Sequence, residues 1–165
     1  MASPNVLVVF YSDTGHTRAA AERVAMALDG KVEAIAAPGL GRGVVGFVTR
    51  VWTALRGRGV EIEPAKHDPD AFDLVIVGAP VWANHVASPT RAYLEQHAAS
   101  LPAVGFLVTL TGDQPGGALA DMSGIVGHDP VATTAINDAD RRNGHDAAKL
   151  RDFVRTLKNA PASAA

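Results

Sequence analysis

Hydroxyl side chains and a glycine gather directly after the first apolar run of the chain, Val6–Phe10. The six residues that follow Tyr11 are Ser12, Asp13, Thr14, Gly15, His16 and Thr17. Hydroxyls and the backbone N–H groups at a helix N-terminus are donors that bind phosphate, and glycine lets the backbone approach a ligand closely. We therefore predict a phosphate site in this segment. The alternative is that the hydroxyls only cap the helix that follows.

This segment differs from two common nucleotide-binding motifs. No lysine follows Gly15, so the segment is not the nucleoside-triphosphate loop G-x-x-x-x-G-K-[ST]. It also lacks the G-x-G-x-x-G pattern of dinucleotide-binding proteins. The sequence therefore excludes both motifs at this position.

A tryptophan stands in the middle of the second segment that could bind a ligand, residues 79–89. Trp82 is one of two tryptophans in the chain, and core packing explains a tryptophan in a loop poorly. A flat indole can form a wall for a flat heterocycle, and such stacking contributes ~0.5–1.5 kcal/mol beyond the burial of area. Asn84 tolerates positive φ, so Ala83 and Asn84 can form a tight turn. The alternative is that Trp82 packs beneath the loop as a local core.

A third segment, Thr111–Gly117, is polar and rich in glycine, and it follows the apolar run Val104–Leu110. Its backbone could hydrogen-bond the edge of the same heterocycle. An ordinary turn explains this composition equally well.

Apolar spacing places all three segments after predicted strands. Continuous apolar runs predict buried strands, and helical spacing predicts helices between them. The predicted strands are 6–10, 31–36, 74–77, 104–110 and 131–136, and the predicted helices are 17–28, 44–55, 88–99, 118–126 and 147–157. This alternation predicts an α/β fold with a parallel sheet and helices on both faces. Ligands of such sheets bind outside the carboxyl ends of the strands.

Composition and charge exclude several classes of protein. The 165 residues suffice for one domain spanning 1–165, with 160–165 expected as a disordered tail. The absence of cysteine excludes disulfides, thiolate catalysis and iron–sulfur clusters, and the histidines show no metal-ligand spacing. A net charge of −2 offers no basic field for nucleic acid, and no apolar run approaches the ~20 residues of a membrane helix. The first residues lack the pattern of a signal peptide, so we expect a cytoplasmic protein.

Two of these segments resemble one family. Residues 12–17 resemble the flavodoxin phosphate loop, [ST]-x-T-G-x-[TN], and residues 73–82 resemble the third strand and flavin-stacking loop of the same family. The resemblance implies a flavodoxin-like three-layer sandwich with a five-stranded parallel sheet in the order 2-1-3-4-5. It also implies one non-covalent FMN and a role in electron transfer.

The resemblance assigns the predicted cofactor-binding residues. Residues 12–17 would hold the FMN phosphate, and Trp82 would cover one face of the isoalloxazine. The residues flanking that ring system would be Pro80, Val81, Trp82, Ala83, Asn84 and His85. The pyrimidine end would be bordered by Thr111, Gly112 and Asp113 within the segment 111–117.

Three departures from the family pattern widen the functional prediction. Ala83 stands where the family often has glycine, and the segment 111–117 lacks the tyrosine that often covers the second flavin face. An open face would admit NAD(P)H or a quinone, so an FMN-dependent NAD(P)H/quinone reductase is an alternative to an electron-transfer protein with a redox partner protein. The net charge of −2 is small for electrostatic steering of such a partner.

Two other classes of protein share this predicted sheet. A flavodoxin-like module that binds no flavin and serves in protein interaction is a further alternative. A receiver-type signalling domain is disfavoured, because it needs clustered acidic residues after strand one, and only Asp13 stands there.

A basic cluster formed by Arg42, Arg50, Arg56 and Arg58 lies beside the predicted helix 44–55. It is either a solvated helix face or a partner contact that uses Trp52.

Overall fold

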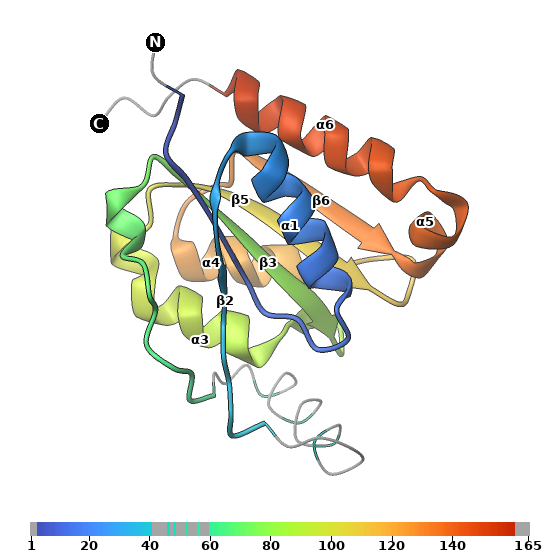
Figure 1. Cartoon of the computed structure of the whole chain (residues 1–165). Helices are drawn as coiled ribbons and strands as arrows, with labels where there is room; N and C mark the ends of the chain where they lie inside the picture. Colours follow the sequence, from blue (N-terminus) through green and yellow to red (C-terminus); the bar gives the residue numbers. More distant parts are fainter. Residues whose placement is uncertain are drawn as a thin grey trace.

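A parallel sheet forms the centre of the molecule (Figure 1). The computed structural model describes residues 3–40, 46, 48, 52, 56 and 60–160. The parallel strands run in the order β2-β1-β3-β5-β6, which confirms the predicted 2-1-3-4-5 order. Their bounds are β1 Val6–Phe10, β2 Lys31–Ala34, β3 Leu74–Trp82, β5 Ala103–Leu110 and β6 Ala132–Asn137. A short strand, β4 (His85–Val86), pairs antiparallel with the end of β3.

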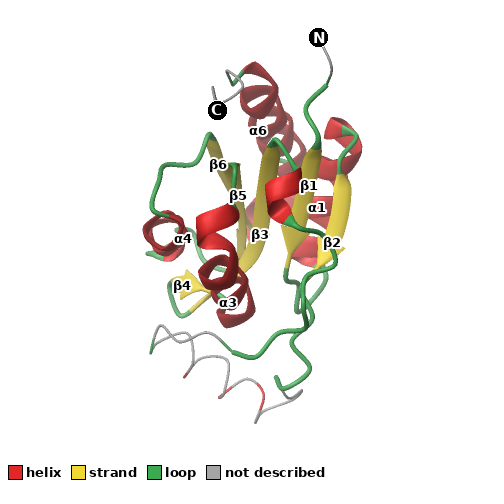
Figure 2. Cartoon of the chain, turned by 90° about the vertical axis from the view of Figure 1, so that its left-hand side faces the viewer, coloured by secondary structure: helices red, strands yellow, loops and turns green. Residues whose placement is uncertain are grey.

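Helices cover both faces of the sheet. The α-helices that the structure describes are α1 His16–Leu28, α3 Ser88–His97, α4 Ala118–Val126, α5 Asp138–Asn143 and α6 Asp146–Asn159. Two short 3-10 helices cover Pro69–Ala71 and Ala98–Ser100. Figures 1 and 2 show α1 and α6 on one face and α3 and α4 on the other. None of the described helices is long and apolar enough to cross a membrane.

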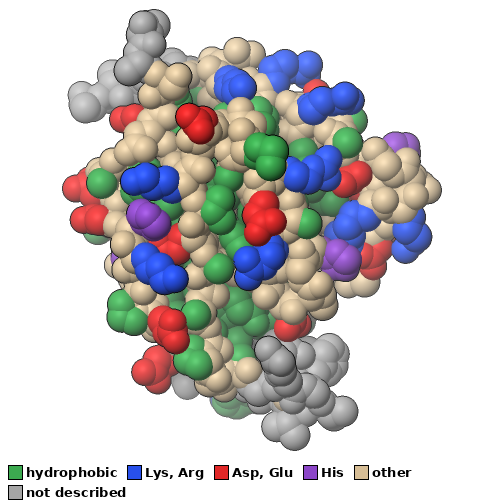
Figure 3. All heavy atoms as spheres, viewed as in Figure 1, with side chains coloured by type: hydrophobic (Ala, Val, Ile, Leu, Met, Phe, Trp, Pro, Cys, Tyr) green, Lys and Arg blue, Asp and Glu red, His purple; other side chains and the backbone are tan. Residues whose placement is uncertain are grey.

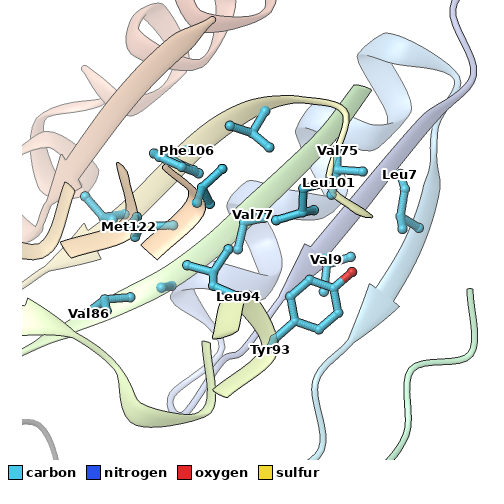
Figure 4. Close-up of a cluster of buried hydrophobic side chains, with 14 of the residues drawn as sticks. Leu7, Val9, Val75, Val77, Val86, Tyr93, Leu94, Leu101, Phe106 and Met122 are labelled. Carbon is cyan, nitrogen blue, oxygen red and sulfur yellow. The ribbon is translucent and has the colours of Figure 1, made fainter. Parts of the chain in front are cut away.

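Alternate residues of the central strands fill two separate cores. Val6, Val8 and Phe10 of β1 pack with α1 and α6, whereas Leu7 and Val9 pack toward α3 and α4. All five are buried, so β1 needs apolar residues on both of its faces. Figure 4 shows the core on the α3 side, where Tyr93 and Leu94 lie among side chains of the sheet. The continuous apolar runs of the sequence are therefore the signature of a strand buried on both faces.

The strand β3 is longer than the prediction. The sequence placed its end at Val77, before Gly78, Ala79 and Pro80, and this boundary is wrong. The strand continues to Trp82, because Gly78, Ala79 and Pro80 remain paired with β5. Pro80 lacks an N–H group, but its carbonyl oxygen accepts a hydrogen bond from the Ala87 N–H at 3.1 Å. Residues 80–82 therefore continue β3 beyond its predicted end as an ordered strand.

Two predicted helix boundaries are also corrected. The first helix begins at His16, one residue before its predicted start, and Asp29 adopts the left-handed conformation at its end, with φ of 51°. The Gly30 N–H donates to the Ala25 carbonyl at 2.9 Å. Ala87 is the N-cap of α3, so that helix begins at Ser88, as predicted, but it ends before the predicted residue 99. The α-helix ends at His97, and a 3-10 turn continues to Ser100.

The connection before β3 is held to the sheet by a buried carboxylate. The edge strand β2 is mostly exposed and ends at Ala34, two residues before its predicted end, but Glu33 within it is only 7% exposed. Glu33 accepts hydrogen bonds from the Lys66 N–H at 2.6 Å and the His67 N–H at 3.0 Å, and it also bonds the His67 ring. The predicted helix 44–55, most of the arginine cluster and the tail after residue 160 lie outside the described residues.

The sequence prediction missed α5, which has only six residues and no apolar periodicity. A capping box begins it: the Asp140 N–H donates to Asn137 Oδ1 at 2.8 Å, and the Asn137 N–H donates to Asp140 Oδ2 at 2.9 Å. Lys149 Nζ of α6 lies 2.6 Å from the same Asp140 oxygen. The Lys149 ammonium, helped by the Asn137 N–H, lowers the pKa of the Asp140 carboxyl, although partial burial opposes this shift.

We expect Asp140→Asn to lower the free energy of unfolding by about 1 kcal/mol at pH 7. The folded-state pKa of Asp140 lies below its unfolded value of about 3.9, so its charge stabilises the fold above that pH. The stabilisation is lost as the pH falls through the folded-state pKa. Urea unfolding at pH 7 and pH 3 should therefore show a difference between variant and wild type that shrinks in acid. Asp152→Asn, at an exposed position of α6, is the control. An equal difference at both pH values would contradict this role.

Candidate functional site

The three polar segments meet at the carboxyl edge of the sheet. Since β1, β3 and β5 are parallel neighbours, the segments that follow them leave the sheet on the same side. The ring of Tyr11 contacts the ring of Trp82, with centroids 5.6 Å apart. The Gly117 N–H donates to the Asn84 carbonyl oxygen at 2.7 Å. These contacts bring the segments 12–17, 80–85 and 111–117 together.

Ser12 organises the loop that leads into α1. Its Oγ accepts hydrogen bonds from the Gly15 N–H at 3.1 Å and from the Arg18 N–H at 3.2 Å. Gly15 has φ of 95°, a conformation that favours glycine, and no atom lies within 4 Å of the position a Cβ would occupy. The Ser12 oxygen therefore caps the start of α1 and supports the loop from within.

Three other side chains of this loop face the solvent. Asp13, Thr14 and His16 are exposed, and the first turn of α1 contains no acidic residue. The N–H groups of His16 and Thr17 begin the helix and have no intrahelical acceptor. The positive end of the helix dipole lies at the same place. This arrangement can bind an anion at the start of α1.

Thr17 lies in the core, where the prediction had expected a surface hydroxyl. Its side chain is 2% exposed, and its Oγ1 lies 2.7 Å from Thr109 Oγ1 of β5. The hydroxyl therefore joins α1 to the sheet, while the backbone N–H remains at the helix start. No local pattern points to Thr109, because this partner stands 92 positions away from Thr17.

The segment after β3 is a hairpin and not the predicted loop. Val81 pairs with Val86, and Trp82 pairs with His85. Ala83 and Asn84 form the turn between them with φ of 48° and 66°, so the predicted tight turn is confirmed. Figure 2 shows β4 beside α3 and α4 at this end of the sheet.

Trp82 is half-buried at the base of this turn. Its indole meets the Tyr11 ring nearly edge-on, with an angle of 86° between the planes. Edge-to-face packing of this kind orients both rings. Tyr11 stands directly before the loop that resembles a phosphate-binding loop, but no motif of the sequence singles it out. Trp82 is therefore neither a fully buried core residue nor an isolated surface residue.

The third segment packs against the hairpin at one point. Gly116 has φ of 57°, and a Cβ there would lie 2.6 Å from the Asn84 Cβ. Any larger residue would displace the hairpin turn. The residues expected at the heterocycle, Thr111, Gly112 and Asp113, are exposed at the same edge of the sheet. They are available to a ligand.

An aspartate of α4 stabilises the hairpin through its carboxylate. Asp121 Oδ2 lies 3.0 Å from His85 Nδ1, accepts the Val86 N–H at 3.1 Å and lies 3.2 Å from an Arg91 guanidinium nitrogen. The Arg91 side chain is only 10% exposed, so its charge needs this carboxylate. Asp121 and Arg91 were missed by the sequence analysis, because they stand on helices and outside the motifs.

We expect Asp121→Ala to lower the free energy of unfolding by about 2 kcal/mol, because a buried guanidinium loses its partner and the Val86 N–H loses its acceptor. Native-state hydrogen exchange should become faster at Val86. Glu95→Gln, at an exposed position of α3, is the control and should change neither quantity. Unchanged exchange at Val86 in Asp121→Ala would show that the hairpin does not depend on this carboxylate.

Comparison with known proteins finds similar folds among solved structures. No protein-family model and no curated protein matches the sequence. Among solved structures, a flavoprotein from Lactobacillus acidophilus NCFM in complex with FMN is similar, with 20% identity, a TM-score of 0.70 and coverage of 85% of this chain and 97% of that one. A two-electron reduced flavodoxin from Megasphaera elsdenii has 16% identity, a TM-score of 0.58 and coverage of 94% and 99%. An apo NADH:FMN oxidoreductase has 15% identity, a TM-score of 0.60 and coverage of 96% and 91%. The chain therefore has the flavodoxin-like fold.

Proposed function

We propose that this chain binds one FMN non-covalently and transfers electrons through it. One observation carries the proposal: an anion site at the start of α1 and a half-buried indole lie at the same sheet edge, joined by the contact between Tyr11 and Trp82. FMN has the matching chemistry, because it combines a phosphate with a flat tricyclic ring. The similarity to an FMN-bound flavoprotein and to a flavodoxin supports the same ligand.

The phosphate end of the proposed site uses residues 12–17. The exposed Thr14 hydroxyl and the N–H groups of His16 and Thr17 would donate to phosphate oxygens. Ser12 and the hydroxyl of Thr17 would act indirectly, since Ser12 Oγ holds the loop and Thr17 Oγ1 bonds Thr109. The site therefore divides into residues that contact the phosphate and residues that keep the loop in place.

The ring end of the proposed site uses the hairpin and the segment 111–113. The Trp82 indole would cover one face of the isoalloxazine, with Pro80, Val81, Ala83, Asn84 and His85 around it. Thr111, Gly112 and Asp113 would border the pyrimidine end through their backbone. When bound, FMN supplies the redox chemistry, and the chain orients the ring and excludes water from one face.

The structure also favours a second candidate function, an FMN-dependent NAD(P)H or quinone reductase. The segment 111–117 has no aromatic residue, so it offers no second ring to cover the other flavin face. The similarity to an NADH:FMN oxidoreductase supports this candidate. A redox partner protein fits the first function, and NAD(P)H or a quinone fits the second. A cytoplasmic location stays a prediction.

We expect titration of the purified apoprotein with FMN to give a saturable change in flavin absorbance and fluorescence. Thr14→Val should weaken binding by about 1–3 kcal/mol, at least several-fold in Kd, because a hydrogen bond to a charged phosphate is lost. Trp82→Ala should weaken binding and change the flavin spectrum, because stacking on the indole is lost.

Two matched variants serve as controls for this titration. Thr156→Val removes an exposed hydroxyl that bonds the Asp152 carbonyl, and Trp52→Leu removes the other tryptophan. Both should bind FMN like wild type. If wild-type protein bound no FMN and gained no thermal stability from it, the flavin-free interaction module would be the correct reading. Equal affinity in Thr14→Val would move the phosphate elsewhere.

Steady-state kinetics distinguish the two redox functions. For an electron-transfer protein, we expect NADH or NADPH oxidation with a quinone acceptor to be no faster than with free FMN at the same concentration. The FMN-loaded wild-type protein and free FMN are compared in parallel. Saturable turnover well above that of free FMN would instead establish the reductase.

A further inference from the structure

A groove lies between α1 and α6, on the helical face away from α3 and α4. Its volume is about 360 Å³, and its lining comes from the second half of α1 and from the length of α6. The floor is apolar and consists of Ala27, Ala147, Leu150 and Val154. Leu150 and Val154 also belong to the core, so the floor is firmly packed. The two alanines leave room that larger side chains would fill.

The rim of the groove carries four cations, Arg23, Arg151, Arg155 and Lys158. Arg23 is paired with Asp146 at 2.7 Å, and Arg155 is paired with Asp152 at 2.8 Å. Arg151 and Lys158 have no ion pair within the part of the chain that the structure describes. The four cations and two carboxylates leave a net charge of +2 at the groove, although the whole chain carries −2. Figure 3 shows Lys and Arg side chains gathered on the side of this face where Figure 1 places α6.

The cations form a row along the helix. Arg151, Arg155 and Lys158 are spaced i, i+4 and i+7, so they lie on one face of α6 over roughly 10 Å. The apolar floor runs beside this row. A small anion would need only one or two of these cations and none of the floor. The groove therefore matches an elongated ligand that has carboxylates along one side and apolar groups along the other.

We propose that this groove binds an acidic amphipathic helix of a partner protein. A groove between two packed helices accepts a third helix, whose apolar side chains would pack on Ala27 and Ala147, the less buried part of the floor, while its carboxylates meet Arg151 and Lys158. A second copy that presented this same groove would be repelled by its positive charge. The groove is lined by Arg23 and Ala27 of α1, past the helix start, so a partner bound there leaves the anion site open. The inference does not depend on FMN binding.

A synthetic peptide provides the probe. A capped helix-forming peptide of about 14 residues, as long as α6, would carry leucines at i, i+3 and i+7 and glutamates beside them. A matched peptide would carry lysine in place of every glutamate. The peptides are titrated into the isotope-labelled full chain and followed by backbone amide NMR. We expect the glutamate peptide to shift the amides of Ala27, Ala147, Leu150 and Val154, with weaker binding at high salt.

Charge-reversal variants complete the test. The double variant Arg151→Glu with Lys158→Glu should weaken binding of the glutamate peptide by about tenfold or more, since two attractive contacts become repulsive. Arg142→Glu, on α5 and outside the groove, is the control and should bind within about twofold of wild type. All three side chains are exposed, so the variants should keep the wild-type amide spectrum elsewhere. The proposal is overturned if the lysine peptide binds equally well, if the shifts map elsewhere, or if the glutamate peptide does not bind.

Discussion

The close approach of α1 to β3 positions the loop that carries the proposed anion site. A Cβ at Gly78 would stand 3.0 Å from the Phe10 Cβ and 3.2 Å from the Thr17 Cγ2, so a larger residue would force these neighbours to move by a few tenths of an ångström. The Tyr11 N–H donates to the Gly78 carbonyl at 3.1 Å, and Thr17 bonds Thr109 of β5. These contacts hold the loop before α1 in place against β3 and β5. The proposed anion site is built on packed elements and not on a free loop.

The hairpin at the end of β3 depends on a second set of supports. It extends beyond the parallel sheet, where no neighbouring parallel strand can pair with it, and its turn places two non-glycine residues at positive φ. Such a turn is stable when the surroundings hold it. The first turn of α4 supplies this support through the Gly117 N–H and the Asp121 carboxylate. Trp82 therefore has a defined position, which a ring-binding wall requires.

Charge is distributed unevenly on a chain that is almost neutral. Three acidic residues act as local supports: Glu33 holds the connection before β3, Asp121 holds the hairpin, and Asp140 begins α5. Cations gather on the rim between α1 and α6. The net charge of −2 says little about partners, because it averages over these regions. The proposed cofactor site and the proposed docking groove use different parts of α1, so a partner and a cofactor could bind at once.

The class of fold and the position of the three polar segments follow from local patterns of the chain. Apolar runs such as Val6–Phe10 report burial on both faces, and burial of this kind belongs to a central parallel strand. The segment 12–17 was recognisable because a helix start needs local hydrogen-bond partners that are close in sequence. The end of β3 and the short helix α5 were not predictable, since cross-strand pairing overrides the breaker residues Gly78 and Pro80, and a six-residue helix shows no period.

Contacts that form only in the folded chain place side chains at or away from the site. The Thr17 hydroxyl lies in the core against Thr109, the Tyr11 ring contacts the Trp82 ring, and Asp121 accepts a hydrogen bond from the hairpin. These partners are far apart along the chain, and a contact between distant residues leaves no periodicity or local motif in one sequence. The physical reason is that local patterns record the burial and backbone needs of a residue, whereas its partners depend on how the whole sheet and its helices pack.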